Sequence, residues 1–223
     1  MPTRSLPTPK KCGCYKKNLL MSHACGVGPL FPTEVVRAAL CIRLNTLLAG
    51  HSGIQLKTAE LLRDMLNKKI HPLVPSQGSV GASGDLCPLS HMALPVIGEG
   101  IVEYHGKEMP ARTALQKEGL KPVDLMYKEG IALNNGTTFM AALATLAIYD
   151  AERLLHLSTL TAALTAESLC ARTDAFDARI HAVRNHAGQK YIAETFRSHI
   201  KGSTFMNVDP SLLPGKKKMP QDA

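Results

Sequence analysis

The sequence GSVGASGD occupies residues 78–85 and decides how the rest of this chain is organised. It lies between a proline-marked segment, His71 to Pro75, and an apolar run from Leu86 to Ile97. Four small residues in a row, Gly81 to Gly84, leave the backbone almost unshielded, so it can turn sharply and contact other backbone closely. Such a segment could be a flexible connector or a phosphate-binding loop. The phosphate interpretation fails, because no Lys-Ser or Lys-Thr follows the last glycine and no Gly-x-Gly-x-x-Gly is present.

Charge and length narrow the function classes. The chain has 223 residues, enough to bury a real core in one large domain or two small ones. Its net charge of +8 is concentrated at the ends, because residues 1–17 contribute five positive charges and residues 216–222 contribute two. A nucleic-acid site would need a basic folded face with aromatic residues beside it. We therefore interpret these lysines as solvated tails and expect no nucleic-acid partner.

Six cysteines in 223 residues do not indicate a disulfide framework, and no signal peptide opens the chain. We expect reduced thiols and a cytoplasmic location. Cys12, Cys14, His23 and Cys25 could together supply four zinc ligands, but their spacing is not a common zinc pattern. We interpret them as scattered thiols and expect no metal. We also expect no membrane span, because polar residues interrupt the uncharged run from 131 to 149.

Periodic apolar residues predict a mainly α-helical protein. Start and stop signals place helices near residues 15–25, 34–50, 57–69 and 111–119, with a β-hairpin at 101–109. Thr33 is expected to cap the second of these helices. A long helix is predicted from Thr138 to about Ala171, and it carries very few charged residues. A helix this apolar must be covered on most sides, which indicates a partner subunit or further chain.

The run from Val74 to Leu94, VPSQGSVGASGDLCPLSHMAL, resembles the loop of the histidine and phenylalanine ammonia-lyase family. In that family the Ala-Ser-Gly tripeptide cyclises on itself to make a methylidene-imidazolone electrophile. The resemblance implies that Ala82, Ser83 and Gly84 are catalytic and form this group as a covalent cofactor, without a metal. The residue types suit the chemistry, because attack of the Gly84 amide nitrogen on the Ala82 carbonyl carbon needs a tight turn with little bulk. We therefore expect Ser83 at the tip of a tight loop.

Two further segments resemble the family and lie far from the loop in sequence. Residues 22–28, Ser-His-Ala-Cys-Gly-Val-Gly, begin with the Ser-His pair typical of the histidine-specific members. Residues 128–137 resemble the Glu-Gly-x-Ala-Leu-x-Asn-Gly-Thr motif, whose asparagine holds the substrate carboxylate. The resemblance implies that His23 and Asn135 bind substrate, so both side chains are expected to point toward Ser83. A solvent-facing histidine at a helix end and an asparagine that caps the long helix are the alternatives.

The resemblance covers residues 15–189, with one further match at the C-terminus. There Gln221-Asp222-Ala223 looks like the start of Gln-Asp-x-Tyr-Ser-Leu-Arg, which implies a substrate-side position for Gln221. The tyrosine and arginine of that motif, and the family's Tyr-Gly-x-x-Thr-Gly-Phe-Gly loop, are not in this sequence. We expect a disordered lead at 1–14, a partial lyase domain at 15–205 and a flexible tail at 206–223, as in the middle of a longer enzyme. Turnover by these residues alone is expected to be impaired.

The fold implied is a long-helix bundle of the aromatic amino acid lyase type, with a small irregular and β-hairpin region around the Ala-Ser-Gly loop. The function implied is non-oxidative deamination of L-histidine to urocanate and ammonia, by a homotetramer with shared active sites. The alternatives are an ammonia-lyase or aminomutase for another aromatic amino acid, a non-catalytic remnant of the fold, and a small N-terminal zinc module. Four further polar residues are interpreted as structural: His91, Glu99, His181 and His186.

Overall fold

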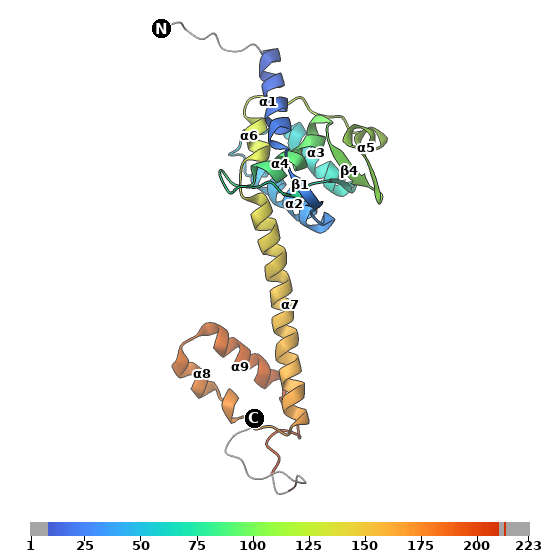
Figure 1. Cartoon of the computed structure of the whole chain (residues 1–223). Coiled ribbons are helices and arrows are strands. Elements are labelled where there is room, and N and C mark those ends of the chain that lie inside the picture. Colours follow the sequence, from blue (N-terminus) through green and yellow to red (C-terminus); the bar gives the residue numbers. More distant parts are fainter. Residues whose placement is uncertain (1–8, 210–211, 213–223) are drawn as a thin grey trace, which may run out of the picture. The chain divides into compact units, whose positions relative to one another are not determined.

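The computed structural model describes residues 9–209 and residue 212, and most of them are helical, as the sequence predicted (Figure 1). The chain divides into two units, Met1–Ala147 and Ile148–Ala223, within the single long helix α7 (Thr138–Ser168). The expected boundaries at 1–14, 15–205 and 206–223 stay a prediction. Gln221 lies outside the described residues, so its role stays a prediction.

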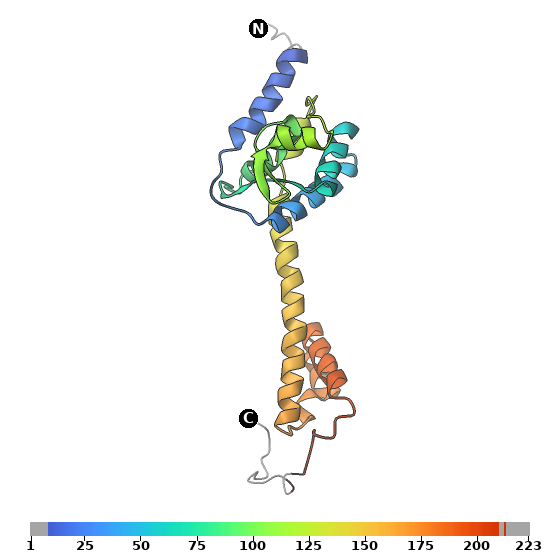
Figure 2. The ribbon, with the colours of Figure 1, turned by 90° about the vertical axis from the view of Figure 1, so that its right-hand side faces the viewer.

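The four helices that apolar periodicity predicted in the first unit are present, together with others that it did not predict. Helix α2 (Thr33–Leu48) and helix α3 (Leu56–Asn67) lie side by side (Figures 1 and 2). Helix α1 (Pro9–His23) begins six residues before Tyr15, so residues 9–14, expected in the disordered lead, are helical. The other helical segments of this unit are the predicted α5 (Ala111–Lys117) and the unpredicted α4 (Leu86–Ala93), η1 (Leu94–Ile97) and α6 (Glu129–Asn134).

The predicted cap of α2 is wrong. Thr33 is the first helical residue, and Pro32 occupies the cap position. The Thr33 hydroxyl instead donates a hydrogen bond of 2.8 Å to the Glu103 carboxylate, which lies on a strand 70 residues away. The hydroxyl therefore donates to a distant carboxylate, where the sequence pattern favoured an oxygen that accepts from nearby backbone N–H groups.

Two small sheets complete the first unit. The predicted hairpin is confirmed as β4 (Ile101–Tyr104) and β5 (Lys107–Pro110), joined through His105 and Gly106 at φ of 51° and 73°. Both residues in the left-handed region are typical of a type I′ turn, which matches the twist of a hairpin. Strand β2 (Ile70–Pro72) adds antiparallel to β4. The sequence did not predict the second sheet, in which β1 (Val27–Leu30) pairs antiparallel with β3 (Pro75–Gln77).

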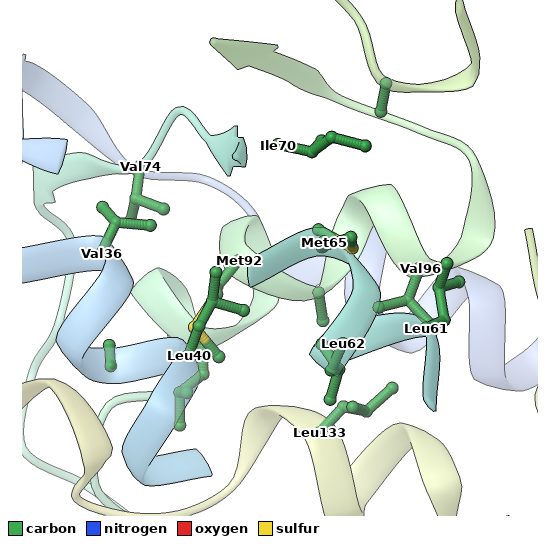
Figure 3. Close-up of a cluster of buried hydrophobic side chains, with 14 of the residues drawn as sticks. Val36, Leu40, Leu61, Leu62, Met65, Ile70, Val74, Met92, Val96 and Leu133 are labelled. Carbon is green, nitrogen blue, oxygen red and sulfur yellow. The ribbon is translucent and has the colours of Figure 1, made fainter. Parts of the chain in front are cut away.

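One apolar core holds these elements together (Figure 3). Leu40 of α2 lies beside Met92 of α4, and Leu62 of α3 lies near Leu133 of α6. All four side chains are fully buried. Since β3 leads into residues 78–85 and α4 follows them, this core fixes both ends of the Ala-Ser-Gly segment.

The second unit is built on the C-terminal part of α7 with α8 (Ala178–Arg184) and α9 (Ala187–His199). Its small core contains Ala163, Phe196 and Ile200, and the Phe196 ring stacks on Phe176 with centroids 3.6 Å apart. The sequence did not predict α8 or α9, although Ala193 and Phe196 lie one helical turn apart on the buried side of α9.

The expectation of an uncovered apolar surface on α7 is confirmed. Within residues 148–168 of this helix, several large apolar side chains are exposed: Ile148, Tyr149, Leu154, Leu155, Leu157, Leu160 and Leu164. Contiguous exposed apolar surface marks an interaction site or an aggregation liability. In the part of the chain that the structure describes, no helix combines the length and hydropathy of a membrane span.

Candidate functional site

The Ala-Ser-Gly tripeptide forms the tight turn that the sequence predicted. Gly81 and Gly84 face each other as an isolated antiparallel bridge, so Ala82 and Ser83 are the tip of the reversal. Ser83 has a φ of 60°, a left-handed conformation that is uncommon for a residue with a side chain. Ala82 and Ser83 are both exposed. The Ser83 hydroxyl is therefore presented on a reversed, solvent-accessible loop and not within a strand or helix.

Gly84 connects this turn to a segment more than 50 residues further along the chain. It forms a parallel bridge with Gly136, and the Asp85 amide donates a 2.7 Å hydrogen bond to the Gly136 carbonyl. A Cβ atom on Gly84 would overlap the Gly136 carbonyl group, and its φ is 87°. Only glycine allows this backbone conformation and this close approach together.

Asp85 fixes the start of the long helix. Its side chain is 3% exposed, and its carboxylate accepts a 3.0 Å hydrogen bond from the backbone N–H of Met140, in the first turn of α7. A carboxylate at this end of a helix satisfies a free N–H group and interacts favourably with the helix dipole. The alternative role for Asn135 was to cap this long helix. Asp85 already supplies a carboxylate at the start of the helix. Sequence reasoning did not assign this role to Asp85.

Asn135 is placed beside the turn by its neighbour Gly136. It follows α6, its side chain is exposed, and its backbone carbonyl accepts a 2.6 Å hydrogen bond from buried Arg43. Asn135 and Gly136 also line an open hollow of about 690 Å³, together with Arg43 and Thr137. The structure thus brings the Asn-Gly-Thr motif to the Ala-Ser-Gly loop through backbone pairing.

The backbone that follows the Ser-His pair lies beside the segment that enters the loop. Val27 pairs with Gln77, and a Cβ atom on Gly78 would lie 3.1 Å from the Gly26 Cα atom. His23 is half-buried at the end of α1, where its Nδ1 atom lies 2.9 Å from the Leu19 carbonyl oxygen. The chain from residue 24 to 27 therefore runs along the segment that enters the loop. The direction of the His23 ring toward Ser83 stays a prediction.

His91 and Glu99 make scaffold contacts. His91 Nε2 lies 3.0 Å from the backbone nitrogen of Gly26, and burial lowers the pKa of His91. The neutral ring is thereby favoured, and its unprotonated Nε2 can accept from the Gly26 N–H. Glu99 forms a 2.6 Å ion pair with Lys17 of α1. These contacts join α1 and the β1 segment to the elements that follow the loop.

Two buried charged residues beside the site were missed by sequence reasoning. Arg43 is 5% exposed and Glu129 is fully buried. A lone charge within an apolar helical run was the available signal for Arg43, and Glu129 was interpreted only as part of the Glu-Gly-x-Ala-Leu segment. Arg43 contacts the end of α6 that leads to Asn135, and Glu129 is the first residue of α6, as described below.

The described residues contain no group of three or more His, Cys, Asp or Glu side chains that could hold a metal ion. The side chains of Cys12 and Cys14 lie outside the described part, so the proposed grouping with His23 and Cys25 is not tested. Further along, His181 lies 3.0 Å by its Nε2 atom from the Ala175 carbonyl oxygen, a contact within its own unit.

Comparisons with known proteins bear on the same residues. The sequence profile described as "Aromatic amino acid lyase" matches residues 5–223. A curated protein from Fusobacterium nucleatum, "Histidine ammonia-lyase 2", is 50% identical over 208 residues, which are 93% of this chain and 40% of that protein. The solved structure of histidine ammonia-lyase from Trypanosoma cruzi matches with a TM-score of 0.82 and 36% identity, over 87% of this chain and 38% of that one. Pantoea agglomerans phenylalanine aminomutase matches with a TM-score of 0.85 and 32% identity, over 92% and 39%.

Proposed function

Since this chain belongs to the aromatic amino acid lyase family, we propose that it is the part of a histidine ammonia-lyase that carries the loop forming the prosthetic group. The chain spans about two fifths of the length of the curated relatives it matches. The proposed reaction is deamination of L-histidine to urocanate and ammonia. The observation that carries the proposal is the pairing of the exposed Ala-Ser-Gly turn with the Asn135–Gly136 segment.

The residues present fit a methylidene-imidazolone group made from Ala82, Ser83 and Gly84. The bridge between Gly81 and Gly84 reverses the backbone over these residues, which is the arrangement a five-membered ring closure needs. The tip is exposed, so no buried side chain has to move. Such a group supplies an electrophilic carbon for the amine of an amino acid. The backbone bond from Asp85 to Gly136 holds the base of the turn in place.

L-Histidine is the proposed substrate, and Asn135 and His23 are its proposed contacts. The Asn135 amide can donate and accept at once, so it can bind a substrate carboxylate while it contacts the loop. The Ser22-His23 pair supports histidine, as does the similarity to the curated protein named histidine ammonia-lyase. The likeness to a phenylalanine aminomutase keeps another aromatic amino acid as the second candidate. Gln221 is retained as a third proposed substrate contact.

Intact-mass measurement tests the prosthetic group. The purified chain is expected to weigh two water molecules less than its sequence mass, because ring closure and loss of the Ser83 hydroxyl each release one water. Ser83→Ala removes that hydroxyl, so no methylidene can form, and the two-water loss should be absent. Ser76→Ala, a hydroxyl removed from strand β3, is the matched control and should keep the loss. A wild-type chain at full sequence mass would contradict the proposal.

Product analysis then distinguishes the substrates. Urocanate released from L-histidine, and absent with Ser83→Ala, would support the histidine reaction. Cinnamate from L-phenylalanine or a β-amino acid product would instead favour the second candidate. A chain that forms the ring yet converts none of these amino acids would match the impaired turnover expected of these residues alone.

The proposal includes a homotetramer, supported by the exposed apolar side chains of α7. Leu157 and Leu164 lie seven residues apart, on one face of the helix, and are 58% and 57% exposed. In sedimentation velocity we expect the wild-type chain to exceed monomer size. Leu157→Glu with Leu164→Glu should shift it toward the monomer, whereas Glu152→Lys should not. A wild-type chain that sediments as a monomer at all concentrations would contradict this part of the proposal.

The proposed location is the cytoplasm. Among the described residues, Cys25, Cys41 and Cys87 are reduced thiols, the state typical of a reducing compartment. Subcellular fractionation tests this, and recovery of the protein with an oxidising compartment would contradict it.

A further inference from the structure

Arg43 is a buried cation in a helix that otherwise presents apolar residues to the core. Its side chain is 5% exposed, and no carboxylate forms an ion pair with it among the described residues. Burial lowers the pKa of Arg43, but an arginine remains charged in proteins. A buried charge is costly unless it is well hydrogen-bonded, so the groups that Arg43 contacts indicate its role.

Both acceptors of Arg43 are backbone carbonyls at the end of α6. Its Nη2 atom donates to Ala132, in the last turn of the helix, and to Asn135, the residue that ends it, at 2.6 Å. The last carbonyls of a helix have no partners within it, and they carry the negative end of the helix dipole. The guanidinium of Arg43 therefore caps α6 from a different helix.

The same guanidinium borders the next residue. A Cβ atom on Gly136 would lie 2.8 Å from Arg43 Nη1, so the Gly136 backbone passes directly beside the cation. Gly136 has a φ of 143°, which favours glycine, and its carbonyl accepts from the Asp85 amide. One continuous set of contacts thus runs from Arg43 through Asn135 and Gly136 to the base of the Ala-Ser-Gly turn.

We propose that Arg43 is a positioning residue for the reaction proposed above: it fixes the Asn135–Gly136 backbone, so that Gly136 anchors the Ala-Ser-Gly turn and the Asn135 side chain is presented beside it. The hydrogen bonds of Arg43 go to Ala132 and Asn135 and not to the residues that form the ring. It acts through the backbone that these residues pair with, and this inference rests on the proposed function of the loop.

Hydrogen exchange at the Asp85 amide tests the proposal without requiring catalysis. This amide bonds to the Gly136 carbonyl, so its protection reports the anchoring of the turn. Losing hydrogen bonds from a charged donor should raise its exchange rate about 10- to 100-fold in Arg43→Met. Arg37→Met is the matched control, because Arg37 lies on the same helix and also donates to a backbone carbonyl, that of Leu66 at 3.2 Å. It should leave Asp85 exchange unchanged.

A conservative variant separates positioning from general stability. Arg43→Lys keeps the charge but loses the planar fork, so we expect exchange at Asp85 between that of wild type and Arg43→Met. If Arg43→Met does not fold, Arg43→Lys alone tests the proposal. An Asp85 amide that is as protected from exchange in Arg43→Lys as in the wild type would then overturn it. Equal exchange in Arg43→Met and Arg37→Met would also overturn it.

Intact mass gives the second readout. The fraction of chains that have lost two waters should fall in Arg43→Met and be partly restored in Arg43→Lys. If wild type loses no water, the proposed function of the loop fails, and the exchange experiment still judges the anchoring by Arg43. If all variants lose water equally while Asp85 exchange is also unchanged, the loop function stands and the role of Arg43 is wrong.

Discussion

Gly84→Ala is expected to abolish formation of the ring and to lower the free energy of unfolding by about 2–5 kcal/mol. Gly84 has a φ of 87°, which costs an alanine roughly 1–2 kcal/mol. The added Cβ atom would also overlap the Gly136 carbonyl, so the turn or the Asn135–Gly136 segment must move. Either movement breaks the 2.7 Å bond from Asp85 to Gly136. Chemical denaturation and intact mass measure the two effects.

Gly81→Ala is the matched control for this prediction. Gly81 is the other glycine of the same bridge and has a φ of 71°, but a Cβ atom there meets nothing within 4 Å. Gly81→Ala should lower the free energy of unfolding only by the cost of the left-handed backbone conformation, about 1–2 kcal/mol. It should still form the ring in part. If the two alanine variants behave alike, the contact with Gly136 does not hold the turn.

Local patterns predicted the local structure of this chain. The apolar spacing in α2 and α3 set their positions to within about two residues, and the glycine at 106 placed the hairpin turn. The run of small residues at 81–84 predicted a tight turn, and Ser83 lies at its tip. In each case the determinants lie within a few residues of the element, where periodicity and turn chemistry act.

Long-range pairing was not predictable in this way. Strand β1 has the sequence Val-Gly-Pro-Leu, which shows no alternation, and its pairing with β3 contains a register irregularity. Thr33 is a standard cap residue by type, yet its hydroxyl bonds to Glu103. Helix α9 is a different case, since the spacing of Ala193 and Phe196 is a local helical signal.

The candidate site shows the same difference between local and long-range determinants. The turn at Ser83 followed from composition, and the expectation that Asn135 lies beside it came from the family resemblance. The backbone pairing of Gly84 with Gly136 now supplies a physical reason for that placement. Asp85 and Arg43 were missed because their partners, Met140 and Asn135, are 55 and 92 residues away. A lone charge in an apolar run indicates burial, but it does not identify the acceptor.

Glu129→Gln is expected to lower the free energy of unfolding by about 3–5 kcal/mol at neutral pH. The Glu129 carboxylate is fully buried at the start of α6 and accepts from the Gln55 and Met126 amides at 3.0 and 2.6 Å, and from the Thr58 hydroxyl at 2.7 Å. A glutamine would replace one carboxylate oxygen with an NH₂ group that faces these donors. The hydrogen bonds to that oxygen would thus be replaced by repulsive contacts between donors. Glu60→Gln, at an exposed position on α3, is the control and should change stability little.

The pH dependence of this difference tests the charge state of Glu129. Burial by itself raises the pKa of this carboxyl, but the hydrogen bonds from Met126, Thr58 and Gln55 outweigh it, and the pKa is lowered. A lowered pKa in the folded state means that the stabilisation is present above the unfolded value of about 4.3 and is lost as the pH falls through the folded value.

The gap in unfolding free energy between wild type and Glu129→Gln should therefore narrow as denaturation is repeated from about pH 7 to about pH 3, because the wild-type carboxyl becomes protonated and resembles the amide. If burial instead dominated, the folded protein would hold Glu129 protonated near neutral pH. Wild type would then gain stability relative to the glutamine variant as the pH falls from 7 toward 4, and the gap would widen. That result would show that these hydrogen bonds do not hold a charge, and that α3 and α6 are joined through a neutral acid.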